Sequence, residues 1–551
     1  MQTVCDKITE VSLRSAVSVL SQCDTHLFFC ALIFSLQMLL TFFLVAILVT
    51  PTLYLYCTWT FDYWKKKGVP FIKPLPLFGN VLAVITRQKT PVDLWVDLYR
   101  AGDGHPFLGL YHFRSPSLLV RDPEMIKNIL VTNFNCFNRT AMKVDRKLDP
   151  LLARHPFVLS GDVWRAVRSL LVPAFTLYKV KNQFPLMAME CREMIQYLEN
   201  EAPKHRPDGL NVRQMTRKFA VDVVVRCGFG IIGNSFHESE GVLRKFGEDF
   251  TAINLWKGIR ILMLTLIPKL PKFLTARFMN LDGQEFFRQL IRELIRYREN
   301  NRVFRNDYLQ MLMHIKYMGK NVKGINTIRV AGVNIEFTDD DIAAHALMFF
   351  FTGTEISSFI LAHVLYELAR NTEIQTQLRE EIDSVLKRHS GGLTYEAIEE
   401  MFYMDMVLNE TLRKYPPFAV LLRTCTRPCE LPLPNGKTFI MDEGVTAVIS
   451  TLALHMDPNN FPEPEKFDPE RFSAERKDSI KPYTFLPFGE GPRQCFAYKF
   501  AQAEIKAGIV AVVSHFEIRT TPRTPVILIR EPFGFPMDVK GGLWLDFVRR
   551  K

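Results

Sequence analysis

The sequence contains no Cys-x-x-Cys pair, although 10 cysteines are spread over its 551 residues. Such scattered cysteines argue against a disulfide framework and are typical of reduced, buried thiols in an intracellular chain. Glycine (28 residues) and proline (32) are close to average usage, which excludes collagen-like and low-complexity chains. The 58 Asp and Glu residues are outnumbered by 69 Lys and Arg residues, which gives a net charge of +11. This charge suits an anionic membrane surface or an acidic protein partner. We expect no nucleic-acid partner.

Charged residues are absent from positions 27–61. The run LFFCALIFSLQMLLTFFLVAILVT, residues 27–50, exceeds the roughly 20 apolar residues that a transmembrane helix needs. A cleavable signal peptide is the alternative, but the run is too long and lacks an Ala-x-Ala-like cleavage site. We therefore expect a single membrane anchor at 27–61, preceded by an N-terminal extension at 1–26.

Three lysines at positions 65–67 follow the anchor, whereas the segment before it is slightly acidic. The positive-inside rule then places the bulk of the protein in the cytosol. Prolines 70, 74 and 76 favour an extended, stiff chain, so residues 62–80 are expected to form a basic, proline-rich hinge. No linker or repeat interrupts residues 81–551, which we treat as one catalytic domain.

Helical patterning dominates that domain. Residues 338–371 open with a Thr cap and three Asp residues, which suit the positive end of a helix dipole, and the stretch then runs apolar almost all round. A helix of that kind lies buried in the centre of a protein. The fold class is therefore mainly α with minor β sheets. Further helices are expected at 378–387, 403–415 and 496–516, and short strands at 437–449 and 526–530.

The most informative segment is YTFLPFGEGPRQCFAYKFAQAEIK, residues 483–506. Its Gly-Glu-Gly-Pro string forms a loop that cannot be helical, Cys495 closes the loop, and an apolar helical pattern follows at once. A thiolate at a helix start is stabilised by exposed backbone N–H groups and by the helix dipole, so Cys495 is a good anionic metal ligand. Phe488 can lie against the sulfur and limit water, and Arg493 offers a charged fork suited to a carboxylate.

The string FGEGPRQCFA is similar to the haem-ligand loop of the cytochrome P-450 family in spacing and residue type. Other segments of the chain follow in the family's order, and the chain most resembles the microsomal, broad-specificity members. The resemblance implies the cytochrome P-450 fold and a haem b whose iron is ligated by the Cys495 thiolate. Electron donation from that thiolate favours O–O bond cleavage. Ala497 stands where many members have Gly, which is a tolerated difference.

Glu410 and Arg413, in NETLRKYPP, are three residues apart and share one helical face. Taken alone, such a pair is commonly an exposed ion pair. Together with Arg471 in FDPERF, the two residues resemble the family's Glu-Arg-Arg triad, a buried network with a structural role beside the haem loop. Leaving one member unpaired is expected to cost about 3 to 5 kcal/mol.

Trp164 and Arg168, in GDVWRAVRSLLVPAF, are four residues apart and resemble the family's haem-propionate pair. Arg423, which follows two prolines, resembles another propionate contact. The alternative for each arginine alone is a solvated surface position. With the resemblance, these three residues join Phe488 and Arg493 as expected cofactor-binding residues.

The central helix of the family carries Ala/Gly-Gly-x-Asp/Glu-Thr, where this chain reads Thr-Gly-Thr-Glu-Ile. Gly353 is expected to allow close approach over the haem, and Glu355 keeps the acidic position. Ile356 replaces the hydroxyl that organises the proton delivered to dioxygen, and a side chain without donor or acceptor cannot do that. Thr352, Ser357 or water are the candidates that could substitute for it.

The resemblance implies a membrane-bound haem-thiolate monooxygenase that inserts one atom of O2 into a small lipophilic substrate. We expect no dinucleotide-binding site in this chain, so electrons come from NADPH through a separate flavoprotein reductase, with cytochrome b5 as an optional second donor. The reductases of the family's endoplasmic-reticulum members have an acidic docking face, which the net charge of this chain complements. The catalytic domain is expected on the cytosolic side of that membrane.

A haem-thiolate isomerase or dehydratase is the alternative reading, because such enzymes rearrange a peroxide or epoxide without external electrons. Ile356 favours it, since peroxide-isomerising branches of the family also lack the threonine. A non-catalytic haem sensor is disfavoured by the retained Glu355. Residues 250–274 resemble the family's access-channel region, and their composition suits interfacial membrane contact, with an ordinary core and loop as the alternative.

Overall fold

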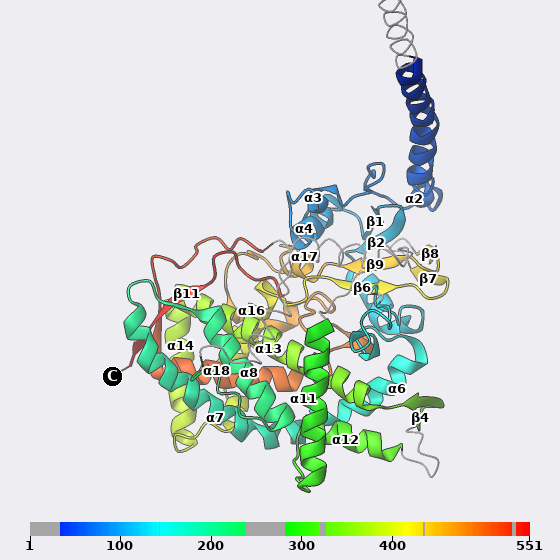
Figure 1. The fold of residues 1–551 in the computed structure, drawn as a ribbon. Coiled ribbons are helices and arrows are strands. Elements are labelled where there is room, and N and C mark those ends of the chain that lie inside the picture. The colour runs from blue at the N-terminus through cyan, green and yellow to red at the C-terminus, as the bar shows by residue number, and fades with distance from the viewer. Residues whose placement is uncertain are drawn as a thin grey trace, which may run out of the picture.

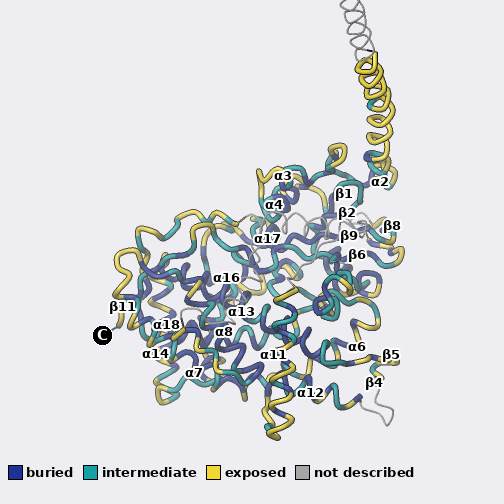
Figure 2. Tube along the Cα trace, in the orientation of Figure 1, coloured by how far each residue is buried: buried dark blue, intermediate teal, exposed yellow. Residues whose placement is uncertain are grey.

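The computed structural model describes residues 33–142, 144–238, 281–319, 327–432, 436–531 and 536–550. An apolar helix of 26 residues, Ile33–Thr58, stands clear of a rounded body (Figure 1), and its side chains are exposed along almost its whole length (Figure 2). The helix is long and apolar enough to cross a membrane, as predicted. The start of the predicted anchor and the extension at 1–26 lie outside the described residues.

The body consists mainly of helices, which confirms the predicted fold class. Short 3-10 turns such as η7 (Pro469–Phe472) and η9 (Gly491–Arg493) lie between them. The helices are α2 (Tyr63–Lys66), α3 (Leu82–Ile85), α4 (Pro91–Ala101), α5 (Pro123–Lys127), α6 (Gly161–Leu171), α7 (Leu177–Glu201), α8 (Val212–Phe229), α11 (Leu281–Asn300), α12 (Tyr308–Met318), α13 (Asp339–Arg370), α14 (Thr372–Arg388), α15 (Tyr395–Glu399), α16 (Phe402–Lys414), α17 (Thr451–His455) and α18 (Tyr498–His515).

Helix α13 runs through the centre of the body and matches the helix predicted at 338–371. Thr338 and Asp341 form a reciprocal cap at its start, in which the Thr338 N–H donates to Asp341 Oδ2 at 2.9 Å. Its apolar side chains face α8, α11 and α18, so most of the helix is buried. Although α13 is also apolar enough to cross a membrane, this burial identifies it as a core helix.

The strands form one four-stranded sheet, one three-stranded sheet and two hairpins. The larger sheet has the order β1-β2-β9-β6, in which β2 and β9 are parallel and the other pairs antiparallel. The smaller sheet has the order β10-β11-β3, and the hairpins are β4-β5 and β7-β8. The strands are β1 (Phe107–His112), β2 (Ser115–Val120), β3 (Leu210–Asn211), β4 (Thr327–Val330), β5 (Val333–Glu336), β6 (Leu421–Thr424), β7 (Cys429–Pro432), β8 (Thr438–Met441), β9 (Thr446–Ile449), β10 (Phe516–Thr520) and β11 (Trp544–Arg549).

Two strand predictions differ from the structure. The segment 437–449 holds two strands, β8 and β9, because the chain turns between them at Gly444, whose φ of +88° favours glycine. The strand predicted at 526–530 is wrong, since the described residues there show only an isolated bridge between Arg530 and Val539. The Lys540 N–H donates to the Ile529 carbonyl and the Glu531 N–H to the Asp538 carbonyl, which are the bonds of that bridge, whereas the Pro525 carbonyl accepts from Tyr366 Oη.

The segment predicted as a stiff hinge packs against the body. Helix α2 buries Trp64 completely, and the indole Nε1 donates to the Leu110 carbonyl at 3.0 Å. The indole covers Gly109 of β1, where a Cβ would lie 2.5 Å from the ring. Phe71 then forms a bridge to the same Gly109. The chain that follows the anchor is therefore joined directly to the larger sheet.

Candidate active site

The loop that ends at Cys495 has a shape that only glycine permits at two positions. Its ends meet where the Cys495 N–H donates to the Phe488 carbonyl at 2.9 Å. Gly489 and Gly491 have φ angles of +73° and +72°, and a Cβ on Gly491 would lie 2.1 Å from the Leu130 carbonyl oxygen. The Gly-Glu-Gly string therefore sets the position of the cysteine just before α18.

Cys495 is exposed, whereas every other cysteine of the described residues is buried. Protein nevertheless surrounds it, and this burial raises the pKa of its thiol. The Ala497 N–H and the charge of Arg168 act in the opposite direction. The stabilisation predicted for a helix start is thus present, and a bound metal ion would add to it by favouring the thiolate form.

Three arginines, Arg168, Arg423 and Arg493, gather on the side of the cysteine loop that faces α6. Trp164 of that helix is buried, and the guanidinium carbon of Arg493 lies 4.4 Å from the centre of its ring. Arg168 lies 5.8 Å from the same ring and donates to the Gln494 carbonyl at 2.7 Å. The structure thus brings Trp164, Arg168 and Arg493 together beside Gln494, and Arg423 is close enough for its charge to lower the pKa of Arg493.

None of these three arginines forms an ion pair with a carboxylate in the described part of the chain. Arg423 donates only to the Leu422 carbonyl, and its buried Nε has no partner among those residues. Burial lowers the pKa of Arg423 to about 10, and burial with the charges of Arg423 and Arg168 lowers the pKa of Arg493 to about 9. Buried positive charge without a counterion favours binding of an anion, and the two propionates of haem fit this donor set.

Phe488 forms the opposite end of the loop from Arg493. Its carbonyl accepts the Cys495 N–H, and its ring lies 5.9 Å from the ring of Tyr498 at the first turn of α18. Arg493 itself donates to the carbonyls of Asn138 and Pro156, so it fastens the loop to the segment before α6. The guanidinium group of Arg493, predicted to bind a carboxylate, is therefore also hydrogen-bonded to backbone carbonyls.

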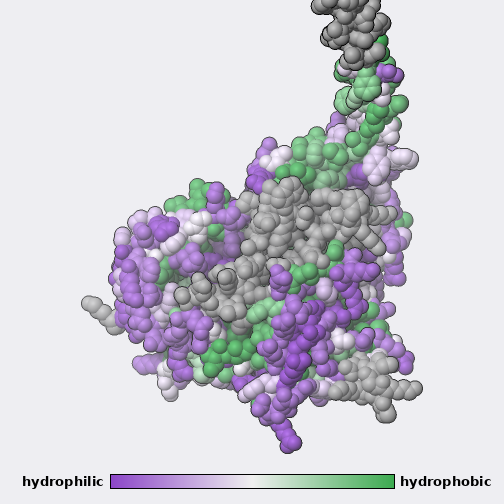
Figure 3. Space-filling model, in the orientation of Figure 1, coloured by the Kyte–Doolittle hydropathy of each residue, from purple (hydrophilic) through white to green (hydrophobic). Residues whose placement is uncertain are grey.

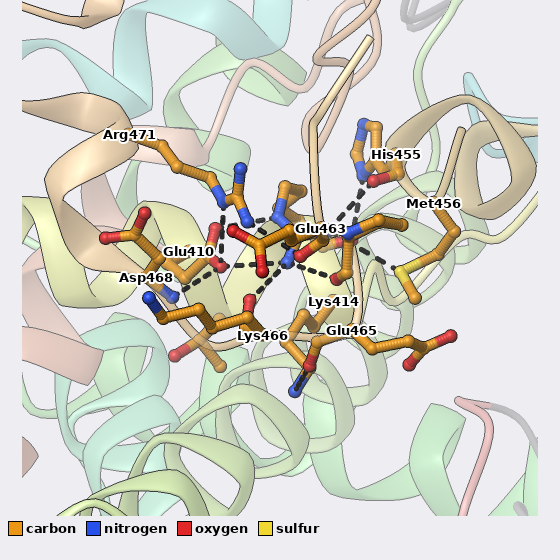
Figure 4. Close-up of polar contacts among 12 residues, drawn as sticks. Glu410, Lys414, His455, Met456, Glu463, Glu465, Lys466, Asp468 and Arg471 are labelled. Carbon is orange, nitrogen blue, oxygen red and sulfur yellow. Dashed lines mark hydrogen bonds and ion pairs between the residues drawn. The ribbon is translucent and has the colours of Figure 1, made fainter. Parts of the chain in front are cut away.

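Glu410, Arg413 and Arg471 meet in a buried network (Figure 4). Arg413 approaches Glu410 with both Nε and Nη2, at 2.7 and 2.8 Å, and Arg471 Nε lies 3.5 Å from Glu410 Oε1. The Asp468 N–H also donates to Glu410 at 2.9 Å. Each oxygen of the carboxylate is therefore engaged, whereas Arg471 Nε takes part through the ion pair alone and has no hydrogen bond among the described residues.

His455 connects this network to the cysteine loop. Its Nδ1 lies 3.1 Å from the Arg413 carbonyl, and its Nε2 accepts from the Leu486 N–H at 2.9 Å. The ring is therefore neutral with the proton on Nδ1, and burial lowers its pKa to about 3. Leu486 lies in the segment that leads to Cys495, so the triad positions the loop through one histidine.

The middle of α13 presents two different faces. Thr352 and Ile356, one turn apart, are half-buried, whereas Glu355 is buried on another side. The hydroxyl of Thr352 donates to the Met348 carbonyl at 2.6 Å within the same helix. Ile356 provides no hydroxyl on this more accessible face, so Thr352 is the member of the pair that carries one.

Glu355 is held by two arginines of α8. Its Oε2 lies 2.7 Å from Arg213 Nη2 and 2.9 Å from Arg217 Nη2, while its buried Oε1 has no partner among the described residues. Asp538 completes the network at 2.7 Å from Arg213 Nε. The acidic residue of the predicted oxygen-handling segment is therefore fixed in a buried ion-pair network.

Gly353 allows a close approach, but to α8. A Cβ on Gly353 would lie 2.8 Å from a methyl group of Val224, in the most extensive contact between helices of the fold. The packing of α13 on α8 is thus one reason for glycine here, and the predicted approach over the haem stays a prediction. Helix packing is a sufficient reason for glycine at this position.

Sequence reasoning missed Arg213, Arg217, Asp538 and Glu504. The two arginines are four residues apart, a spacing that marks one helix face, but their partners are distant in sequence. Glu504 lies fully buried on α18, burial raises the pKa of its carboxyl well above the usual range, and the nearby Ser357 hydroxyl acts in the opposite direction. No local pattern of residues 498–515 predicts a carboxyl in that position.

One sequence string has the spacing of a dinucleotide-binding fingerprint, and sequence reasoning overlooked it. Residues 228–233 read Gly-Phe-Gly-Ile-Ile-Gly. The functional motif follows a strand and opens a helix, whereas this string closes α8, with Gly230 in the left-handed region at φ +68°. The string at 228–233 therefore lacks the context of a nucleotide-binding loop, and the expected absence of a dinucleotide-binding site stays a prediction. The predicted access segment at 250–274 lies outside the described residues.

An accessible thiol beside arginines that lack carboxylate partners in the described residues suits the haem-thiolate class of proteins. The family model "Cytochrome P450" matches residues 69–545, and the chain belongs to this family. Cytochrome P450 6k1 of Blattella germanica is 35% identical over 528 residues, which cover 94% of this chain and 98% of that protein. Cytochrome P450 9e2 of the same insect is 34% identical (90% and 96% covered), and probable cytochrome P450 6g2 of Drosophila melanogaster is 33% identical (89% and 95% covered).

Family membership confirms the resemblance on which the sequence predictions rest. Members of this family are generally haem-thiolate monooxygenases, so the chain is an enzyme whose cofactor is a haem ligated by a cysteine thiolate. The family generally needs a redox partner and acts on lipophilic substrates. The apolar helix Ile33–Thr58 is consistent with a single membrane anchor.

Proposed function

We propose that this protein is a membrane-anchored monooxygenase that inserts one atom of O2 into a small lipophilic substrate, with Cys495 as the ligand of haem iron. Trp164, Arg168, Arg423 and Arg493 hold the propionates, and Phe488 covers the sulfur. The observation that carries the proposal is the set of arginines without carboxylate partners beside the accessible thiol of Cys495. Haem, when bound, supplies the oxygen-activating chemistry, while these residues orient it and limit water.

Electrons are proposed to come from NADPH through a separate flavoprotein reductase, with cytochrome b5 as a second donor. The net charge of +11 supports an acidic partner, and the string at 228–233 lacks the strand–turn–helix context of a nucleotide site. The anchor at 27–61 and lysines 65–67 support insertion in the endoplasmic reticulum with the domain at 81–551 in the cytosol. Protease added to sealed microsomes is then expected to digest the body.

Two measurements test the proposal directly. The reduced carbon monoxide complex is expected to show the absorption band that is characteristic of thiolate-ligated haem, and Cys495→Ser is expected to abolish it. Purified full-length protein with reductase and NADPH is then expected to oxidise members of a lipophilic substrate panel. A band that persists in Cys495→Ser would show that another residue ligates the iron.

A second candidate function is an isomerase or dehydratase that acts on a peroxide or epoxide without external electrons. It is favoured by Ile356, which gives the half-buried face of α13 no hydroxyl, and by Glu355, whose carboxylate is engaged with Arg213 and Arg217. Turnover of a lipid hydroperoxide in the absence of NADPH and reductase would support this function over the monooxygenase.

A further inference from the structure

Three cysteines that are scattered in the sequence lie together at the β6 edge of the larger sheet. Cys136 ends the 3-10 turn η2 (Phe134–Cys136), Cys425 follows β6 and Cys429 begins β7, and all three belong to one hydrophobic cluster. The backbone joins their segments, because the Thr426 N–H and hydroxyl both donate to the Cys136 carbonyl, at 2.7 and 3.0 Å. All three thiols are free. We call Cys136, Cys425 and Cys429 the thiol cluster.

Two members of the thiol cluster are in direct contact. The side chains of Cys429 and Cys136 are hydrogen-bonded to each other. Cys425 is engaged elsewhere, because its Sγ donates to the Arg427 carbonyl at 2.8 Å. Cys136 and Cys429 are 8% and 5% exposed, whereas Cys425 is completely buried. Since a disulfide requires two sulfur atoms that already lie close together, the geometry selects Cys136 and Cys429 as the pair that can form one.

Arg427 makes this pair chemically unequal. Its Nε donates to Cys136 Sγ at 3.4 Å. Burial, and next the hydrogen bond with Cys136, raise the pKa of the Cys429 thiol, so Cys429 stays protonated at neutral pH. A cationic neighbour is the usual mark of a reactive cysteine, and a protonated thiol beside it serves as the resolving partner. Cys136 is therefore the thiol that is oxidised first.

The pair lies just beneath a surface that faces water. Arg427, Pro428 and Glu430 are exposed around Cys429. In Figure 3 the right edge of the body, where the β7-β8 hairpin runs (Figure 1), is mainly hydrophilic. Hydrogen peroxide is little larger than water, so the small exposed fractions of the two thiols are enough for it to reach them.

We propose that Cys136 and Cys429 are a redox-modification site, at which hydrogen peroxide converts the two thiols into a reversible disulfide. The Cys136 thiolate attacks one peroxide oxygen, the O–O bond breaks, and the other oxygen leaves as hydroxide and is protonated to water. Cys429 then attacks the sulfur of the resulting sulfenic acid, forms the S–S bond and releases a second water molecule. Together the two thiols lose two electrons and two protons to one peroxide molecule.

The disulfide joins two segments that contact other important parts of the body. Asn138, two residues after Cys136, accepts from Arg493 of the cysteine loop at 2.8 Å. Asp442, which follows the β7-β8 hairpin, lies 2.8 Å from Lys67 just after α2. The bond between Cys136 and Cys429 therefore fastens the chain beside the Cys495 loop to the hairpin beside the anchor.

The test treats the full-length, haem-loaded protein with hydrogen peroxide, alkylates it in denaturant and digests it with trypsin. Cys136 lies in the tryptic peptide 128–139. Trypsin does not cut before Pro428, so Cys425 and Cys429 stay in one peptide, 424–437. We expect mass spectrometry to find these two peptides linked, and dithiothreitol to separate them. The link is expected to persist in Cys425→Ala and to be absent from Cys429→Ser.

The order of the two steps is tested with dimedone, which traps sulfenic acids. In Cys429→Ser we expect dimedone on Cys136, whereas in Cys136→Ser we expect none on Cys429. Arg427→Gln is expected to slow formation of the link about threefold or more, because Cys136 loses its cationic neighbour. Arg476→Gln, which removes a half-exposed arginine paired with Asp468, is the matched control and is expected to leave the rate unchanged.

A wild-type protein in which Cys136 and Cys429 stay reduced, while peroxide oxidises glutathione in a parallel solution, would overturn the proposal. A link that survives in Cys429→Ser and disappears in Cys425→Ala would assign the bond to Cys425 and also overturn it. The proposal is independent of the haem chemistry, because the oxidant is added from solution. The carbon monoxide spectrum of each variant before treatment shows that it is folded and loaded with haem.

Discussion

Arg213 of α8 and Glu355 of α13 form a buried ion pair, with 2.7 Å between Arg213 Nη2 and Glu355 Oε2. Their side chains are 9% and 1% exposed, and Asp538 engages the same arginine from the C-terminal part of the chain. The pair joins the middle of the central helix to α8 at the turn that also carries Ile356. The position of the oxygen-handling segment therefore depends on residues far from it in the sequence.

Arg213→Gln is expected to lower the free energy of unfolding by about 3 kcal/mol, because it leaves the buried Glu355 carboxylate with one cationic partner and Asp538 without its closest one. Arg217→Gln is the matched control. Loss of the Arg217 guanidinium leaves the Arg213 pair intact, so we expect the free energy of unfolding to fall by only about 1 kcal/mol. Urea denaturation of both variants measures the difference, and equal effects would show that Arg213 has no special role.

Ile356→Thr is expected to raise the fraction of NADPH electrons that appear in product, if the protein is a monooxygenase. The new hydroxyl can donate to the Thr352 carbonyl one turn earlier, which limits the structural cost of the change. Product formation, NADPH consumption and peroxide release are measured side by side in both proteins. Val is the control substitution at this position, because it is β-branched like Thr but has no hydroxyl.

Tight coupling in the wild type that Ile356→Thr does not change would contradict this prediction. It would show that Thr352, Ser357 or water already relays the proton. NADPH-independent turnover of a lipid hydroperoxide, unaffected by the substitution, would instead support the isomerase alternative.

Glu410→Gln is expected to destabilise the protein by about 3 to 5 kcal/mol, because Arg413 and Arg471 would remain charged in a buried network without their carboxylate. Arg476→Gln removes a neighbouring ion pair with Asp468 in which the arginine side chain is half exposed. We expect Arg476→Gln to destabilise the protein by less than about 0.5 kcal/mol. Thermal unfolding and the yield of haem-loaded protein distinguish the two variants.

His455 makes stability depend on pH below neutrality. Its pKa in the folded protein, about 3, is below the ordinary value of 6.5, so the unfolded chain binds its proton first as pH falls. The contribution is complete above pH 6.5 and is lost toward pH 3. Between pH 7 and 5 the loss for one such group is about 2 kcal/mol. His455→Gln is expected to be less stable at pH 7 but to show a shallower decline, measured by urea denaturation at each pH; an unchanged slope would contradict the assignment.

Arg423→Met is expected to have opposite effects on the haem-free and haem-loaded protein. Without haem, the change removes a buried charge whose Nε has no partner among the described residues, so stability is expected to stay constant or rise by about 1 kcal/mol. With haem, loss of one propionate partner is expected to speed haem transfer to an acceptor protein by about tenfold. Destabilisation of the haem-free protein with unchanged haem retention would show that Arg423 has a structural role only.

Local patterns predicted those elements whose determinants are local. Helix α13 begins and ends within one residue of its prediction, because Thr338 caps it and its apolar sequence requires burial on all sides. The strand at 526–530 failed because a run of branched residues favours a strand only where a neighbouring strand is available. There the backbone pairs only at the single bridge between Arg530 and Val539, and the Pro525 carbonyl bonds instead with Tyr366, which is distant in sequence.

The site divides in the same way. The glycines before Cys495 and the three-residue spacing of Glu410 and Arg413 are visible in the sequence, and so is the departure at Ile356. The partners of Glu355 cannot be predicted from the sequence, because nothing near residues 213 or 538 indicates that α8 and the C-terminal segment meet at α13. The role of His455 likewise depends on the fold, which brings Arg413 and Leu486 to opposite nitrogens of one ring.

The indole of Trp64 lies on the bare backbone of Gly109. Only five residues, 59–63, separate Thr58, the end of the apolar helix, from this buried contact. A connection this short leaves the body little freedom to rotate relative to the anchor helix or to tilt away from the lipid surface. The body is thus held in one orientation relative to the anchor helix. The packing of the Trp64 side chain therefore sets which face of the body a lipid-dissolved molecule meets.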